Sequence, residues 1–137
     1  MQDNIKTFSE NKPLSDSEKA LLAEIAETLK ASVPCTGCGY CVDGCPQKLN
    51  IPLLIKLYNN AKFNTDIGAS MSMDSFSEKE LPKACINCGK CARTCPQKID
   101  VPTVMKDFAQ LYEKMPKWAD LCKTRAALAA ELDKKYS

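Results

Sequence analysis

The sequence predicts an all-α fold made of two pseudo-symmetric units, each a cysteine-rich loop that leads into a helix. The clearest observation is an internal repeat, because Cys-Pro-Gln-Lys-Leu-Asn-Ile-Pro at 45–52 returns as Cys-Pro-Gln-Lys-Ile-Asp-Val-Pro at 95–102. After each copy, apolar residues recur at the spacing of a helix that buries one face. No stretch reads convincingly as a strand, and the long segment between the copies leaves room for whole helices. We therefore expect two loop-and-helix units with flanking N-terminal and C-terminal helices.

The first flanking helix is expected ahead of the cysteines. Ser15 and Glu18 form the pattern of a capping box, in which each side chain bonds the backbone of the other residue. Val33-Pro34 ends the helix, since the residue before a proline is pushed out of the helical region. The apolar spacing predicts a buried face made of Leu21, Leu22, Ile25, Ala26 and Leu29.

Each repeat continues into a helix that begins at a proline. Pro52 and Pro102 suit the first helical turn, where the missing N–H costs no hydrogen bond. The repeat also matches Tyr58 of the first helix with Phe108 of the second. The predicted apolar stripes are Leu53, Leu54, Leu57 and Tyr58 in the first helix, and Val104, Met105, Phe108 and Leu111 in the second.

The remaining segments are a connector and a final helix. Residues from about 62 to 76 are rich in Ser, Met, Asp and Asn, and are interpreted as a mobile connector. The final helix is predicted to start near Pro116 and to run almost to the end of the chain. Its apolar stripe includes Trp118 as a core anchor and Cys122 as a small buried core residue.

Eight of the nine cysteines form two copies of the pattern Cys-x2-Cys-x2-Cys-x3-Cys-Pro. This spacing is typical of proteins that bind two [4Fe–4S] clusters, in which the fourth cysteine of each run ligates the cluster of the other run. The proline after the fourth cysteine stops the chain from curling back onto its own loop. We therefore expect one cluster to be held by Cys35, Cys38, Cys41 and Cys95, and the other by Cys85, Cys88, Cys91 and Cys45.

Five other residues of the cysteine loops are candidate cluster contacts. Glycine lets the backbone approach closely, so N–H groups can point at cluster sulfurs and tune the reduction potential. A tyrosine in the first loop is expected to shield its cluster from water. The matched position in the second loop is a lysine. Unequal potentials are therefore expected for the two clusters. The candidates are Gly37, Gly39 and Tyr40 in the first loop and Gly89 and Lys90 in the second.

A disulfide framework and zinc sites are the alternative uses of eight cysteines. We expect no secretory signal, because residues 1–10 are polar. Closely spaced cysteines also suit metal binding better than mutual bridges. Zinc ribbons usually present pairs of cysteines rather than runs of four. The chain contains no histidine, which excludes a Rieske centre, a histidine-ligated haem and a histidine-based acid–base site. We expect no catalytic residues in this chain.

Charge and hydropathy indicate the surroundings of the protein. The net charge of +2 is too small to indicate nucleic-acid binding, and no apolar run is long enough to span a bilayer. From Lys83 onward, eleven Lys or Arg stand against six Asp or Glu. This half offers either a docking face for an acidic partner or an ordinary solvated surface. Thiolates persist in a reducing compartment, so a cytoplasmic location is expected.

Three stretches carry a family resemblance. They are Cys-Thr-Gly-Cys-Gly-Tyr-Cys at 35–41, Cys-Ile-Asn-Cys-Gly-Lys-Cys at 85–91, and an opening with Asp-Asn-Ile at 3–5 and Pro-Leu-Ser at 13–15. Together they resemble the C-terminal iron–sulfur region of bacterial aldo/keto reductase family oxidoreductases. The resemblance implies a domain similar to the α-helical ferredoxins, joined to a (β/α)8 reductase barrel that uses NADP. Residues 1–34 would lead from that missing domain into a dicluster domain at 35–137.

The leading functional hypothesis is electron transfer through two [4Fe–4S] clusters, as the C-terminal module of such an oxidoreductase. One alternative is a free-standing ferredoxin-like subunit that docks onto a separate flavoprotein or reductase. A second alternative is a structural or sensing domain, in which clusters or zinc hold the fold. The first two hypotheses require a redox partner protein.

Overall fold

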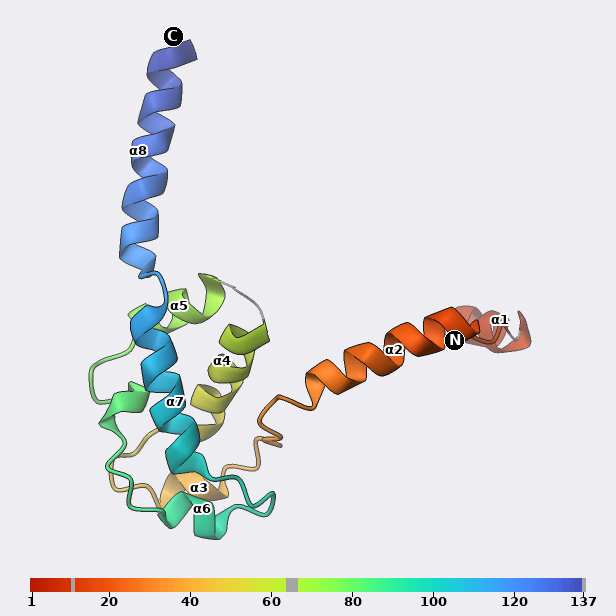
Figure 1. Ribbon diagram of the computed structural model, residues 1–137, viewed down its shortest axis with the longest axis horizontal. Coiled ribbons are helices and arrows are strands. Elements are labelled where there is room, and N and C mark those ends of the chain that lie inside the picture. The colour runs from red at the N-terminus through yellow and green to blue at the C-terminus, as the bar shows by residue number, and fades with distance from the viewer. Residues whose placement is uncertain (11, 64–66, 137) are drawn as a thin grey trace. The chain divides into compact units, whose positions relative to one another are not determined.

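The computed structural model describes residues 1–10, 12–63 and 67–136 (Figure 1). Within these ranges the chain is helical and contains no strand, which confirms the predicted all-α class. None of these helices combines the length and apolar character that crossing a bilayer requires. The chain divides into two compact units, Met1–Ser32 and Val33–Ser137, and both cysteine motifs belong to the second.

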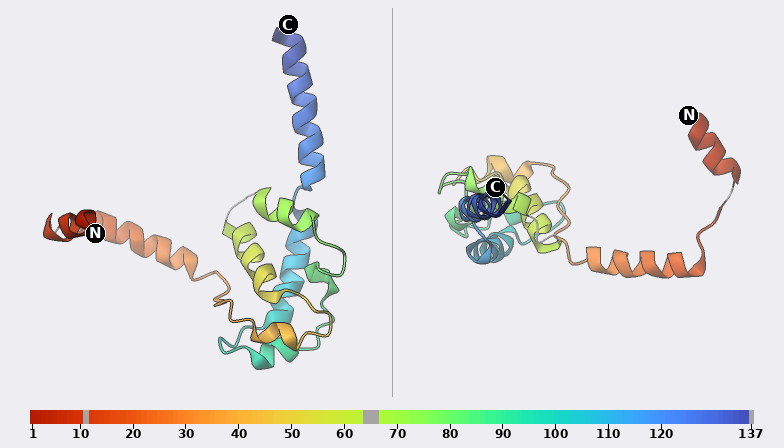
Figure 2. Two further views of the ribbon diagram at one scale, coloured as in Figure 1. Left: turned by 180° about the vertical axis from the view of Figure 1, so that it is seen from behind. Right: turned by 90° about the horizontal axis from the view of Figure 1, so that it is seen from above.

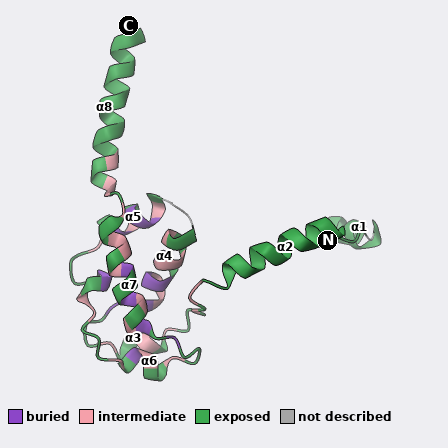
Figure 3. Ribbon diagram, in the orientation of Figure 1, coloured by how far each residue is buried: buried purple, intermediate pink, exposed green. Residues whose placement is uncertain are grey.

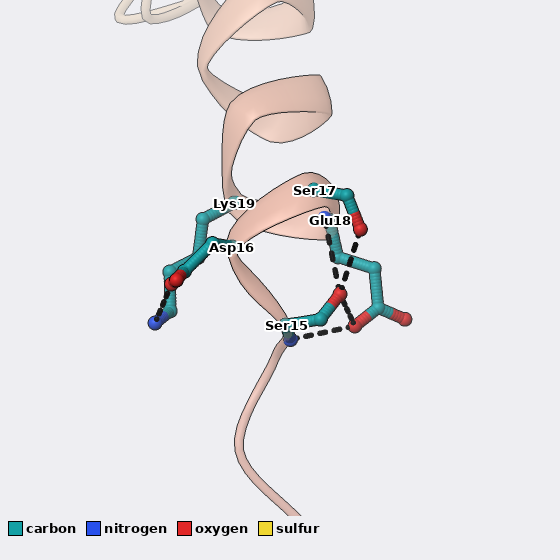
Figure 4. A network of polar contacts seen from close by, with 5 residues as sticks. All are labelled: Ser15, Asp16, Ser17, Glu18 and Lys19. Carbon is teal, nitrogen blue, oxygen red and sulfur yellow. Dashed lines mark hydrogen bonds and ion pairs between the residues drawn. The ribbon is translucent and has the colours of Figure 1, made fainter.

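The first unit contains α1 (Gln2–Glu10) and α2 (Asp16–Leu29). The predicted capping box is confirmed at the start of α2 (Figure 4). The Glu18 backbone N–H donates to Ser15 Oγ at 3.3 Å, and the Ser15 backbone N–H donates to Glu18 Oε2 at 2.8 Å. Hydrogen bonds from Ser15 favour the charged carboxylate and lower the pKa of Glu18.

The apolar face predicted to be buried on α2 is exposed in the structure (Figure 3). Leu21, Leu22, Ile25 and Leu29 are between 46% and 57% exposed, and the described residues of this unit include no buried one. The prediction was wrong because apolar periodicity identifies a helix face without supplying an element to cover it.

The core of the second unit lies between α4 (Ile51–Phe63) and α7 (Val101–Lys114), the helices that follow the two cysteine loops. These helices lie side by side (Figures 1 and 2). The rings of Tyr58 and Phe108, which the repeat matches, meet with their centroids 5.5 Å apart. The apolar side chains that are at most 2% exposed include Leu49, Ile51, Leu54, Ile55, Met73, Val101, Met105 and Phe108.

Both core helices start where the repeat predicts, with proline in the first turn and a polar residue before it. Asp100 Oδ1 accepts the Thr103 backbone N–H at 3.4 Å, and Asn50 Oδ1 accepts the Leu53 backbone N–H at 3.3 Å. These side chains pair N–H groups that the first turn of a helix leaves without partners. Of the predicted stripes, Leu54, Leu57, Met105 and Phe108 are buried, whereas Leu53, Tyr58, Val104 and Leu111 are partly buried.

Short helices lie inside the cysteine loops. They are α3 (Tyr40–Asp43) in the first loop and α6 (Lys90–Thr94) in the second, and they contact each other. The 3₁₀ helix η1 (Pro82–Ala84) precedes the second loop and packs on α7. The two cysteine loops are therefore adjacent in space, at the end of the core where α4 and α7 begin (Figure 1).

The predicted connector contains a packed helix, α5 (Ile67–Asp74), while residues 64–66 lie outside the described ranges. Ala69, Ser70 and Met73 are buried, and Ser70 Oγ donates a hydrogen bond of 2.5 Å to the Pro116 carbonyl. Interpreting the whole of 62–76 as a mobile connector was therefore wrong. Small and polar side chains gave this segment too little apolar periodicity for a helix to be recognised.

The last helix, α8 (Trp118–Tyr136), begins close to the predicted start and contacts α5. Trp118 is half-buried but is not one of the side chains packed against the hydrophobic core, so its prediction as a core anchor was wrong. Cys122 is exposed, so its prediction as a buried core residue was wrong. As on α2, the apolar stripe of α8 lacks a cover, and Leu128 and Leu132 are both 55% exposed.

Asn59 of α4 holds the chain segment that enters the first cysteine loop. Its Oδ1 accepts the Val33 backbone N–H, and its Nδ2 donates to the Val33 carbonyl, both at 2.9 Å. These bonds are partly buried and join residues that are distant in sequence. Asn59 therefore fixes the approach to Cys35 from the side of the core.

We expect Asn59→Ala to lower the stability of the protein by about 1–3 kcal/mol, because two partly buried backbone groups lose their partners. The measurement is guanidinium unfolding followed by near-ultraviolet circular dichroism, without oxygen and with iron retained. Asn60→Ala on the same helix is the matched control, since Asn60 is exposed, and it should change stability by less than about 0.5 kcal/mol. Equal losses in the two variants would contradict the role given to Asn59.

Candidate metal centre

Two cavities in the second unit are each lined by four cysteines. Each cavity takes three cysteines from one motif and the fourth from the other motif. The two cavities are similar in size. Site 1 is the cavity lined by Cys35, Cys38, Cys41 and Cys95. Site 2 is the cavity lined by Cys85, Cys88, Cys91 and Cys45.

A tight turn follows the fourth cysteine of each motif and redirects the chain into the core. The Lys48 backbone N–H donates to the Cys45 carbonyl at 3.0 Å, and the Lys98 backbone N–H donates to the Cys95 carbonyl at 3.0 Å. Both lysines have a φ of 53°, in the left-handed region. The repeated Cys-Pro-Gln-Lys sequence thus forms the same turn twice, once against each cavity.

A glycine precedes the short helix in each loop. Gly39 has a φ of 83° and Gly89 a φ of 71°, a conformation that other residues adopt only with strain. The turn to positive φ starts α3 and α6 and places Cys41 and Cys91 as the second residue of each helix. The positive φ is therefore one reason for glycine at this position. The close approach of the backbone to the cluster, which the sequence predicts, is a second reason.

One side chain lines both sites. Val101 lines both cavities and is only 1% exposed. Ile51, its match in the repeat, lines site 2, and Ile55 lines site 1. The sites thus share one apolar side chain, and residues of the packed core line both of them.

The apolar surroundings affect the chemistry of the thiols. Burial raises the pKa of Cys41 to about 11, and it also raises the pKa of Cys91. Both thiols are therefore protonated at neutral pH when no metal is bound. Metal binding must release these protons, so affinity for metal should increase with pH.

Thiols are the metal-binding groups that both sites present, and the donor set fits iron–sulfur chemistry. All nine cysteines lie in the described ranges, and none of them forms a disulfide there. Among the described residues, no three His, Cys, Asp or Glu side chains converge closely enough to hold a single metal ion. The four cysteines of each site surround a cavity instead.

The other candidate residues divide between the sites. Gly39 and Tyr40 line site 1, while Gly89 and Lys90 line site 2. Tyr40 is 64% exposed, so it covers site 1 only in part. Gly37 lies instead in a surface depression beside Cys35, although its φ of 71° shows that glycine suits this place.

Several residues that line the sites were not singled out from the sequence. Gln47 faces site 2 and Gln97 faces site 1, each directly after a Cys-Pro pair. Their repetition in the Cys-Pro-Gln-Lys sequence is the signal that could have identified them. Val101 carried no such signal, because its place between the cavities depends on how the two halves pack.

Comparison with known proteins identifies the cofactor. The 4Fe-4S dicluster domain family matches residues 34–99, which contain all eight motif cysteines. No curated protein and no solved structure matches the chain. The matched stretch is an iron–sulfur domain of the ferredoxin-like kind, and the chain carries two [4Fe–4S] clusters.

Proposed function

We propose that this chain is an electron-transfer module of an oxidoreductase. The observation that carries the proposal is the pair of four-cysteine cavities that share Val101 in their linings. When bound, the [4Fe–4S] clusters supply one-electron chemistry, gaining an electron from a reduced protein partner and passing it to an oxidised one. The chain itself holds, spaces and insulates these groups.

The cysteines act as ligands in this proposal, and no residue of the chain acts as a nucleophile or an acid–base catalyst. Site 1 supplies Cys35, Cys38, Cys41 and Cys95 as ligands of one cluster, and site 2 supplies Cys85, Cys88, Cys91 and Cys45 as ligands of the other. Cys38 and Cys88 are exposed and give each site an edge that a partner can approach.

We further propose that the partner is an aldo/keto reductase barrel, fused to this module or associated with it, in the reducing interior of a cell. The support is the resemblance of the motifs and of the opening residues to the C-terminal region of such oxidoreductases. NADP would bind to that barrel, since this chain offers neither the barrel nor its catalytic residues. The mass of the native protein tests whether the barrel is fused.

Electron transfer requires that both sites hold a cluster and that the clusters can be reduced and reoxidised. We expect protein purified without oxygen to contain about eight irons and eight sulfides per chain, and to be reduced and reoxidised without loss of iron. Iron and sulfide analysis before and after one redox cycle is the measurement. Zinc with little sulfide, or iron that is lost on reduction, would contradict the proposed function.

Paired cysteine substitutions test which thiols share a cluster. Cys45→Ala and Cys85→Ala should each remove one cluster, leaving about four irons. Because both residues line site 2, the double variant should still retain about four irons. Cys35→Ala combined with Cys45→Ala should remove both clusters, because these residues line different sites.

The opposite pattern would contradict the ligand assignment. If Cys35 and Cys45 held the same cluster, their double variant would keep about four irons and the Cys45–Cys85 double variant would lose both clusters. The single variants serve as controls, because the double variants can be compared only if each single variant keeps one cluster.

A further inference from the structure

The internal repeat allows the charges around the two sites to be compared position by position. Residues 35–52 and 85–102 align without a gap, so each residue near site 1 has a matched residue near site 2. Charge differs at only three matched pairs in these segments. The pairs are Tyr40 with Lys90, Asp43 with Arg93, and Asn50 with Asp100.

Two of these pairs lie on the short helices inside the cysteine loops. Lys90 lines site 2, whereas the uncharged Tyr40 lines site 1. The Arg93 guanidinium lies over Gly89, with Nη1 3.5 Å from the position that a Cβ would occupy there, and Gly89 also lines site 2. Asp43 is the residue of α3 that the repeat matches with Arg93. The two short helices therefore differ by three charges, one negative on α3 and two positive on α6.

The other charged positions either match between the two segments, lie near both sites or belong to an ion pair. Lys48 follows the turn at site 2 and Lys98 follows the turn at site 1, so these charges are equal. Asp100 lies between Ile99, which lines site 1, and Val101, which lines both sites. Lys83 precedes Cys85 but forms an ion pair with Glu78. Within the described ranges, neither Lys90 nor Arg93 belongs to an ion pair that would offset its charge.

Solvent exposure differs much less than charge. The first and fourth cysteines of both motifs are partly buried, and the second cysteine of both is exposed. The third differs slightly, since Cys91 is 8% exposed and Cys41 is partly buried. Cluster potential depends on nearby charge, on hydrogen bonds to the sulfurs and on exposure. Charge is therefore the main difference between the sites.

We infer that site 2 holds the cluster of higher potential, because Lys90 and Arg93 stabilise the added negative charge of its reduced form. This inference rests on the proposed electron-transfer function and gives it a direction. The first electron taken up by the chain resides at site 2, next to the cationic surface of α6. A one-electron acceptor with an acidic surface fits that face, while the less positive face of α3 is left to the donor.

Charge reversal on the short helices tests the inference. The full chain carrying both clusters is reduced stepwise at an electrode, which supplies the electrons, and each midpoint potential is followed by EPR. Arg93→Asp should lower the higher midpoint potential by about 59 mV. At a fixed electrode potential this is about a tenfold fall in the ratio of reduced to oxidised cluster. Asp43→Arg should raise the lower midpoint by a similar amount. Each variant should move the other midpoint less.

Arg125→Asp is the matched control, because Arg125 is an exposed arginine on α8, a helix that packs on α5. It should leave both midpoints nearly unchanged. The inference is overturned if Arg93→Asp shifts the lower midpoint instead, or shifts neither midpoint more than Arg125→Asp does. If Arg93→Asp fails to retain iron, Asp43→Arg decides alone, and an unmoved lower midpoint overturns the inference. Failure of the unaltered chain to undergo reversible reduction would contradict the proposed function itself, so the two failures can be distinguished.

Discussion

The structure of the second unit depends on the exchange of the fourth cysteine between the two halves of the repeat. Each cavity contains three cysteines of one motif and one of the other, so neither half can form a complete site alone. The exchange brings α3 beside α6 and α4 beside α7. With both sites formed, Val101 lies between them and Phe108 is fully buried in the core behind them. In this arrangement the cofactor sites and the hydrophobic core form one packed body.

The sequence predicted best the features that local chemistry determines. The Ser15–Glu18 capping box, the prolines that start α4 and α7, and the all-α class all follow from short-range patterns. The cofactor could also be predicted, because the spacing of thiols around a cluster is a local constraint. The repeat went further and matched Tyr58 with Phe108, two rings that are in contact in the structure.

Features that depend on packing partners could not be predicted in the same way. The apolar stripe of α2 and the position of Cys122 on α8 both indicated a buried face, yet both are exposed. Conversely, α5 buries Ala69, Ser70 and Met73 although its sequence resembles a linker. Val101 shows the same limit at the sites themselves, since its role in both cavities arises only when the two halves meet. Periodicity shows which residues share a face, and tertiary structure decides what covers that face.

The central claim is that the two cluster sites are neighbours that share the Val101 side chain in their linings. EPR of the fully reduced chain tests it directly, because unpaired electrons on two adjacent clusters interact magnetically. We expect a broadened spectrum that changes shape between the half-reduced and fully reduced states. A fully reduced spectrum that equals the sum of two independent, non-interacting signals would contradict the close approach of the two sites at Val101 and the relay that depends on it.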